Sequence, residues 1–113
     1  RRTSMVTDNI LKMYYITLNT PEEARTISYA LLENRLAVCT NWFPISCAYR
    51  WQGEIKEEPE VVLMVKTKSG LRAPIEKLIS AHITYSNYIA ELDVHSVNAG
   101  FLQWLQAEVP MAE

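Results

Sequence analysis

The sequence predicts an α+β fold in which one antiparallel sheet is backed by two helices. Three features indicate it: four stretches have the apolar or alternating pattern of strands, two stretches have apolar residues at helical spacing, and a turn dipeptide joins the two middle strands. The resulting order is strand, helix, strand, strand, helix, strand, followed by a short terminal helix. This order is the split βαβ or ferredoxin-like plan, here with a long central hairpin.

Length and composition predict one packed domain. The chain has 113 residues, 49% of them hydrophobic and 21% charged, which suits a single core better than two. Residues 1–9 show no periodicity, and we expect them to be a loose N-terminal tail or a remnant of expression. The domain is therefore assigned to residues 10–113.

The charge balance and the apolar runs exclude two classes of partner. A formal net charge of -2 provides no surplus of positive charge to neutralise nucleic acid. The longest apolar run, residues 61–65, is far shorter than the roughly 20 residues that cross a bilayer, and from the pattern of the opening residues we expect no secretory leader. Cys39 and Cys47 lie in one extended stretch, about 26 Å apart at 3.3 Å per residue, too far for a disulfide. We expect a reducing, cytoplasmic location.

The first strand and helix have clear local signals. Residues 10–18 are rich in β-branched and aromatic side chains, typical of a strand covered on both faces. Thr20 at the N-cap, Pro21 at the first helical position and Glu23 three residues after the cap form a capping box. These signals predict a helix over residues 21–35.

A long hairpin occupies the middle of the chain. Residues 37–51 alternate in strand fashion, Gln52-Gly53 forms the turn, and residues 54–66 are polar at first and then continuously apolar. We expect the tip to project and the base to be buried. Pro44 marks a bend or bulge, and with Pro59 it predicts a kink shared by both strands.

The remaining elements follow the hairpin. A second helix is predicted with His82 at or just past its end, then a strand over residues 88–94, and then a helix that Asn98 caps and Pro110 ends. The apolar positions of the second helix are Leu71, Ile75, Leu78 and Ile79.

One face of this sheet has no helix to cover it. Its strands do not alternate cleanly with polar residues, so that face carries apolar side chains, and Tyr49 and Trp51 lie near the projecting tip. Such a surface predicts a homo-oligomer in which hairpins embrace neighbouring copies. The alternative is a monomer that exposes these side chains.

Several stretches also resemble a known family. Residues 36–41, LAVCTN, resemble its L-A-A-C-V-N, residues 49–53, YRWQG, resemble Y-x-W-x-G, and Glu60 with Lys66-Thr67 resembles E-V-x-x-x-x-K-T. Trp104 stands where the terminal helix of the family has its tryptophan. Over residues 13–105 the chain resembles the CutA family of divalent-cation tolerance proteins. The resemblance implies an intertwined homotrimer similar to PII signalling proteins, with metal or small-molecule clefts between subunits, and no enzymatic activity.

The sequence departs from that family where metal ligands are expected. The family's H-P-Y-E-x-P-E is replaced by HITYSNY over residues 82–88, and only His82 survives from it. Members proposed to bind copper use a first-strand cysteine and a His-His pair, but Leu18 and Ala81-His82 stand at these positions. We therefore expect no tightly bound cofactor. Cu(II) or another divalent cation is the expected weak ligand, with His82 as the first candidate and Cys39 as the second. The alternatives are a helix-end imidazole for His82 and inert packing for Cys39.

The resemblance and the strand positions together suggest a cleft between subunits, lined by Trp51, Glu60, Lys66 and Tyr85. The alternative for Glu60 and Lys66 is a salt bridge between subunits. The alternative function is a PII-like scaffold or small-molecule-binding protein that has lost the metal ligands, since tyrosines such as Tyr85 are typical of contact surfaces. An enzyme with Cys39 as nucleophile would need a nearby base and is the weakest hypothesis.

Overall fold

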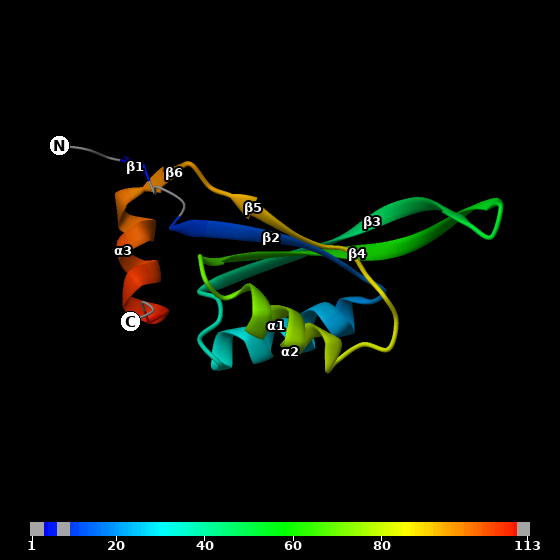
Figure 1. The fold of residues 1–113 in the computed structure, drawn as a ribbon, viewed down its shortest axis with the longest axis horizontal. Coiled ribbons are helices and arrows are strands. Elements are labelled where there is room, and N and C mark those ends of the chain that lie inside the picture. The colour runs from blue at the N-terminus through cyan, green and yellow to red at the C-terminus, as the bar shows by residue number, and fades with distance from the viewer. Residues whose placement is uncertain (1–3, 7–9, 111–113) are drawn as a thin grey trace.

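The computed structural model describes residues 4–6 and 10–110 of the chain and gives the arrangement in Figure 1. The strands are β1 (Ser4–Val6), β2 (Leu11–Leu18), β3 (Cys39–Trp51), β4 (Glu54–Lys68), β5 (Ile89–Asp93) and β6 (Ser96–Asn98). The helices are α1 (Pro21–Glu33), α2 (Arg72–Ser80) and α3 (Ala99–Glu108).

The main sheet confirms the predicted α+β, ferredoxin-like plan. Its strand order is β3-β4-β2-β5, and each neighbouring pair is antiparallel. Helices α1 and α2 lie side by side under one face of it (Figure 1). The order follows from the chain path: each helix carries the chain across the sheet, so the two outer strands, β3 and β5, flank the β4-β2 pair.

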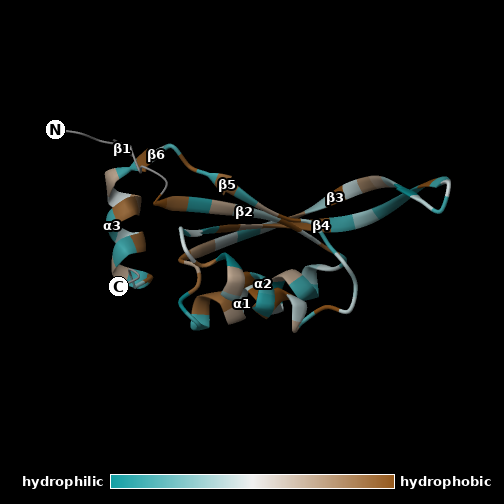
Figure 2. Cartoon of the chain, viewed as in Figure 1, coloured by the Kyte–Doolittle hydropathy of each residue, from teal (hydrophilic) through white to brown (hydrophobic). Residues whose placement is uncertain are grey.

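The core lies between this sheet and the two helices. Alternate residues of β2 and β4 point toward the helices and are fully buried, and the helices meet them with their own apolar stripes. Figure 2 shows the hydrophobic colouring concentrated where the strands cross above the helices. The core side chains from strands are Tyr14, Ile16, Leu18, Val61, Leu63 and Val65, and those from helices are Ala24, Ile27, Leu31, Ile75 and Ile79.

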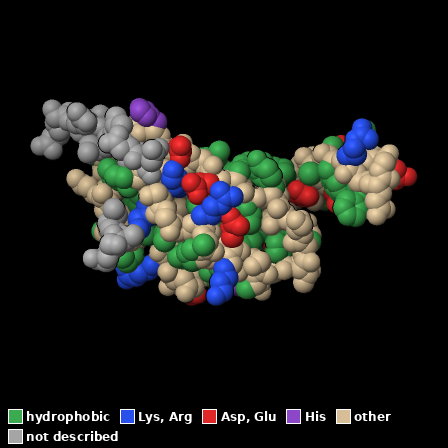
Figure 3. Space-filling view, in the orientation of Figure 1, with side chains coloured by type: hydrophobic (Ala, Val, Ile, Leu, Met, Phe, Trp, Pro, Cys, Tyr) green, Lys and Arg blue, Asp and Glu red, His purple; other side chains and the backbone are tan. Residues whose placement is uncertain are grey.

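The outer half of the β3–β4 hairpin, residues 45–60, projects from the body, and we call it the arm (Figure 1). The arm stretches the molecule to 54 Å along its longest axis, and in the space-filling view it stands out from the rest of the surface (Figure 3). Gln52 and Gly53 have φ values of 50° and 82°, as a two-residue type I′ turn requires. Because Glu54 to Pro59 are exposed while Val61, Val62 and Leu63 are buried, the predicted projecting tip and buried base are confirmed.

The prolines do not interrupt the hairpin. The register runs without a break from Cys39 opposite Lys66 to Trp51 opposite Glu54, so no bulge is present at Pro44, contrary to one of the two expectations for it. Strand β3 is an edge strand, where a residue without an N–H is tolerated. The arm is therefore one continuous two-stranded ribbon.

The face of the sheet opposite the helices is bare in the protomer. It carries apolar side chains from all four strands, and we call it the bare face. Phe43 and Leu92 on this face are 44% and 41% exposed, and Tyr15 lies opposite Met64 between them. An apolar surface of this kind, without a helix over it, is expected to meet another protein surface.

A segment near the N-terminus pairs with the segment before α3, which was not predicted. Strand β1 pairs with β6 in a separate two-stranded sheet, whereas residues 1–9 were expected to be a loose tail or remnant. That expectation is wrong for Ser4–Val6, because backbone pairing can recruit a segment without hydrophobic periodicity. The remaining residues of the expected tail, 1–3 and 7–9, lie outside the described residues.

Helix α3 lies at the end of the body away from the arm (Figure 1). Its buried residues Leu102 and Leu105 pack in a second small cluster with Leu11, Val38 and Val109. Asn98 occupies the N-cap position, as predicted, but its side chain makes no capping hydrogen bond.

Candidate functional site

A pocket of about 610 Å³ lies where the arm leaves the body. Three segments form it: the arm, the C-terminal end of β2 with the residues after it, and the loop of residues 81–88 that links α2 to β5. The side chains that line it are Thr17, Leu18, Asn19, Cys47, Tyr49, Trp51, Glu58, Glu60, Tyr85, Ser86, Asn87 and Tyr88. We call it the arm pocket.

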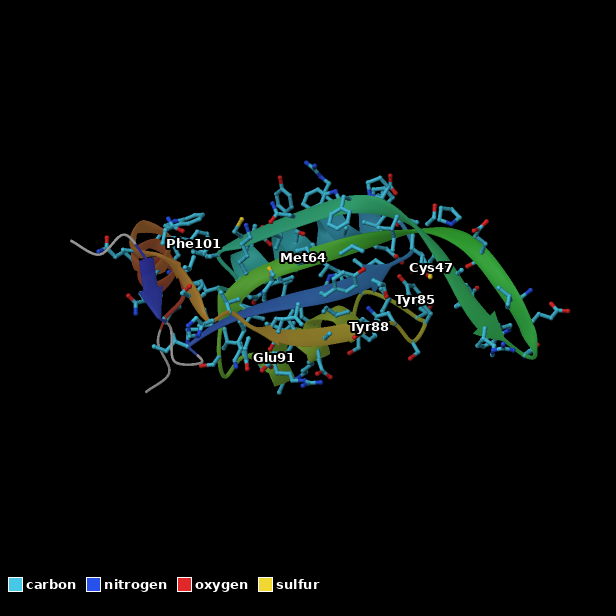
Figure 4. All side chains as sticks on the ribbon, turned by 90° about the horizontal axis from the view of Figure 1, so that it is seen from above. Cys47, Met64, Tyr85, Tyr88, Glu91 and Phe101 are labelled. Carbon is cyan, nitrogen blue, oxygen red and sulfur yellow. The ribbon has the colours of Figure 1, made fainter. Side chains whose placement is uncertain are left out.

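Strand periodicity brings the arm residues into this pocket. Cys47, Tyr49 and Trp51 are alternate residues of β3, so they share one face of the ribbon. The register places Glu58 directly opposite Cys47, and Glu60 is two residues further along β4 on the same face. Figure 4 shows Cys47 at the root of the arm, next to Tyr85 from the loop.

Hydrogen bonds hold the loop against the body. The Tyr85 phenol donates to Glu23 Oε1 at 2.6 Å and accepts from the Asn19 N–H at 2.9 Å. Asn87 Nδ2 donates to the Thr17 carbonyl at 2.9 Å. These contacts join the loop to the first turn of α1 and to the end of β2, so this wall of the pocket is preorganised.

The two carboxylates set the electrostatics of the arm pocket. Burial raises the pKa of the Cys47 thiol, and its hydrogen bond to Glu60 and the negative charges of Glu60 and Glu58 raise it further. The pKa of Tyr49 is raised mainly by its hydrogen bond to Glu58. Among the described residues of one protomer, the lining contains no lysine or arginine. A thiol with a raised pKa is a weak nucleophile at neutral pH, so the arrangement favours binding over covalent chemistry.

Of the four residues predicted to line a cleft, three lie together and one lies apart. Trp51, Glu60 and Tyr85 line the arm pocket. Lys66 is six residues from Glu60 on the same strand, about 20 Å away at 3.3 Å per residue. Its ammonium group lies 5.8 Å from the centre of the Phe101 ring, in a second pocket of about 230 Å³ beside α3. Within one protomer, therefore, Glu60 and Lys66 are too far apart to pair.

The two predicted metal ligands also lie apart. His82 is exposed just beyond α2, as predicted, in a surface hollow with Arg25 and Glu33 of α1. Its Nδ1 lies 2.9 Å from the Leu78 carbonyl. Cys39 lies partly buried against the small cluster beside α3.

No metal centre forms in the part of the chain that the structure describes. Among residues 4–6 and 10–110 no three His, Cys, Asp or Glu side chains come together in a way that could hold a metal ion. Tight binding needs three or four converging donors. The side chains described in one protomer therefore do not fit a tightly held metal ion.

Sequence reasoning did not assign Cys47, Glu58 or Asn87 to the site. The signal for the first two was present, because a two-residue turn at Gln52-Gly53 fixes which residues of the hairpin face each other. Nothing in the local sequence indicates that Asn87 would bond to β2.

Among the described residues no helix is long and apolar enough to span a membrane.

Comparison with known proteins identifies the family. The chain matches the family "CutA1 divalent ion tolerance protein" over residues 12–108. It is 39% identical over 93 residues to the divalent-cation tolerance protein CutA of Thermus thermophilus, covering 80% of this chain and 90% of that protein. It is 34% identical over 94 residues to human protein CutA, covering 81% of this chain but only 52% of the human protein.

A solved structure agrees with these sequence matches. The periplasmic divalent cation tolerance protein CutA from Archaeoglobus fulgidus superposes with a TM-score of 0.85 at 33% identity, over 88% of this chain and 99% of that one. The predicted family resemblance is thus confirmed at the level of sequence and of fold. The chain belongs to the CutA1 family of divalent ion tolerance proteins.

Proposed function

We propose that this chain acts as a non-enzymatic, homotrimeric divalent-cation tolerance protein of the cytoplasm, and that it contacts divalent cations such as Cu(II) only weakly. The observation that carries the proposal is the bare face. Phe43 and Leu92 stay 44% and 41% exposed there, next to the half-buried Tyr15 and Met64. Burial of apolar area yields about 25 cal/mol per Å², which supports association of copies through this face.

The arm supports self-association in a second way. It is a two-stranded ribbon that carries Trp51, 54% exposed, and Ile55, 75% exposed, far from the body. Isolated two-stranded ribbons are marginally stable in water. Packing of each arm against a neighbouring copy would stabilise it and would place the arm pocket next to the subunit boundary.

The proposed cation contact is the imidazole of His82. Because the Leu78 carbonyl can only accept, the neutral ring carries its proton on Nδ1 and leaves Nε2 as the nitrogen for a metal. Imidazole suits Cu(II), which binds nitrogen donors more tightly than other first-row divalent cations do. A single exposed imidazole per protomer gives weak binding.

Native mass spectrometry of the metal-stripped protein tests assembly and metal uptake together. Spectra are recorded before and after a modest excess of Cu(II), for the wild type, for His82→Ala and for the control His95→Ala, which removes the other histidine. We expect trimer masses throughout and weak copper uptake that His82→Ala loses and His95→Ala keeps. A monomer mass would contradict the assembly, and unchanged copper uptake in His82→Ala would contradict the cation contact.

A second candidate function is binding of a small molecule, and the arm pocket favours it. Its volume of about 610 Å³ lies in the range of ligand sites, and the Tyr85 and Asn87 contacts hold one wall in place. In this case the protein would be a PII-like binding module in which metal plays no part. Ligand-induced shifts of pocket resonances in NMR spectra, obtained without added metal, would distinguish it from the first candidate.

A further inference from the structure

We propose that β6 is an acceptor edge for an extended strand and that β1 is its detachable ligand, a strap that fastens β6 and α3 to the body. This role is separate from cation tolerance and from the arm pocket. Its basis is that a strand outside the family match supplies the backbone pairing of β6, directly before α3. Both strands pair within one protomer, so the role does not depend on which surfaces the trimer covers.

Strand β6 relies on β1 for its backbone pairing. The chain leaves the main sheet at Val94, whose N–H donates to the Leu11 carbonyl at 3.2 Å. It then enters the separate two-stranded sheet, in which Met5 lies opposite Val97. Within residues 4–6 and 10–110, β1 is the only strand that pairs with β6. Because the N–H and C=O groups of an open strand edge bind any extended backbone, this edge of β6 has the chemistry of a peptide acceptor.

Strand β1 has the properties of a detachable ligand. It is three residues long, it lies outside residues 12–108 that match the family, and it is not part of the four-stranded main sheet. Two-stranded pairs are marginally stable on their own, and the ends of a chain open more easily than its core. The β1–β6 pair is therefore expected to open before the rest of the fold does.

The pairing fastens the start of α3. Strand β6 ends at Asn98 and α3 begins at the next residue, but the Asn98 side chain makes no capping hydrogen bond. The other end of α3 has its own fastening, because Arg35 Nη1 donates to the Glu108 carbonyl at 3.1 Å. Strand β1 thus holds the N-terminal end of the helix, as Arg35 holds the C-terminal end. All three elements lie at the end of the body away from the arm (Figure 1).

The strap also acts on the surroundings of Lys66. The second pocket, of about 230 Å³, is lined by Val97 of β6 and Phe101 of α3 together with Met13 and Lys66 of the main sheet. The Lys66 ammonium lies 5.8 Å from the centre of the Phe101 ring, within the range of cation–π attraction. When β1 detaches, β6 and α3 lose a support, and the Phe101 ring becomes free to move relative to Lys66.

Amide hydrogen exchange, measured by NMR on the full-length assembled protein, tests the strap. Met5→Pro combined with Val6→Pro removes two consecutive N–H groups, and one of the two faces β6 because strand N–H groups alternate in direction. We expect exchange in β6 and α3 to become at least about tenfold faster, and the Phe101 ring resonances to shift. The matched control, Arg1→Pro with Arg2→Pro, places the same residues before β1 and should change exchange less than about twofold.

Returning the strand as a separate molecule tests the acceptor edge. The probe is a synthetic peptide of residues 1–9, and the control peptide carries Met5→Pro and Val6→Pro. A strand on a short tether acts at an effective concentration in the millimolar range, so we expect the peptide to bind the proline variant of the protein with a Kd of about that size or tighter. Binding should return exchange in β6 to the wild-type rate. Wild-type protein, whose edge is occupied, should bind the peptide at least about tenfold more weakly.

Three results would overturn the proposal. Unchanged exchange in β6 and α3 of the proline variant would show that β1 fastens nothing. Equal acceleration in α2 would show that the effect is not confined to β6 and α3, whereas unchanged exchange in α2 shows that the body stays folded. Failure of the peptide to bind the variant, or equal binding of the control peptide, would show that β6 is no acceptor. Native mass spectra of the same samples report the proposed trimer separately.

Discussion

The Tyr85 phenol donates a 2.6 Å hydrogen bond to Glu23 Oε1, and so it joins the loop after α2 to the first turn of α1. The two residues are far apart in sequence, and Glu23 Oε1 also accepts from the Asn19 N–H at 3.0 Å. One carboxylate oxygen thus fixes both the start of α1 and one wall of the arm pocket. The stability of the helix start and the shape of the pocket are therefore linked.

Removing this hydroxyl should destabilise the protein measurably. We expect Tyr85→Phe to lower the free energy of unfolding by about 1.5 kcal/mol, the value of a hydrogen bond to a charged group. The control is Tyr88→Phe, because the Tyr88 side chain is 61% exposed. This substitution should change the free energy of unfolding by less than about 0.5 kcal/mol. Urea unfolding at one fixed protein concentration measures both, since association adds to apparent stability. Equal stability of the two variants would show that the Tyr85–Glu23 bond contributes nothing.

Alkaline pH should lower stability because of Tyr14. Burial raises the pKa of this phenol above its ordinary 10.0, and its 2.8 Å hydrogen bond to Glu91 and the Glu91 charge raise it further. Below pH 10 the phenol is neutral in both states, and its contribution to stability is complete. Above pH 10 the unfolded chain loses the proton while the folded protein keeps it, so the free energy of unfolding falls as the pH rises.

Urea unfolding between about pH 9 and about pH 11 measures this slope. Tyr14→Phe should flatten it. Part of the slope should remain in that variant, because burial and Glu23 raise the pKa of Tyr85 in the same direction. A wild-type stability that stays constant or rises over this range would contradict the prediction.

The arm tip should be sensitive to the side chain at position 53. Gly53 has a φ of 82° and open space around the position of a Cβ atom, so Gly53→Ala costs only the strain of the left-handed backbone, about 1–2 kcal/mol. We expect faster amide hydrogen exchange at the arm tip and a lower melting temperature. Gly100→Ala is the matched control, because alanine is favoured inside a helix and the nearest atom there is 4.0 Å away. Unchanged exchange at the tip of the Gly53→Ala arm would contradict the assigned turn.

Local sequence signals were sufficient for elements but not for long-range contacts. The capping box illustrates both: Thr20 Oγ1 accepts from the Glu23 N–H at 3.1 Å, as the spacing predicts, whereas the Glu23 side chain bonds to Tyr85 and to the Asn19 N–H. The first contact depends on residues three apart. The Glu23 hydrogen bond to Tyr85 depends on how the chain returns after α2, which no local pattern specifies.

In the candidate site, too, contacts within the hairpin could be predicted and contacts between distant segments could not. The turn at Gln52-Gly53 fixes the pairing along the arm, so the closeness of Cys47 and Glu58 could have been worked out from the sequence. The distance between Glu60 and Lys66 follows from their positions on one strand. Tyr85 was expected to line a cleft, but the hydrogen bonds by which Tyr85 and Asn87 hold the loop in place could not be predicted, because they are tertiary contacts of an irregular loop.

Association of copies of this chain through the bare face can be tested by sedimentation equilibrium on a matched pair of variants. Phe43→Asp places a charge on the bare face, and Leu32→Asp places one at a similarly exposed position on α1, since the two side chains are 44% and 38% exposed. Far-UV circular dichroism checks that both variants are folded. We expect a trimer for the wild type and for Leu32→Asp, and a smaller species for Phe43→Asp. A monomeric wild type, or a Phe43→Asp trimer of undiminished affinity, would contradict it.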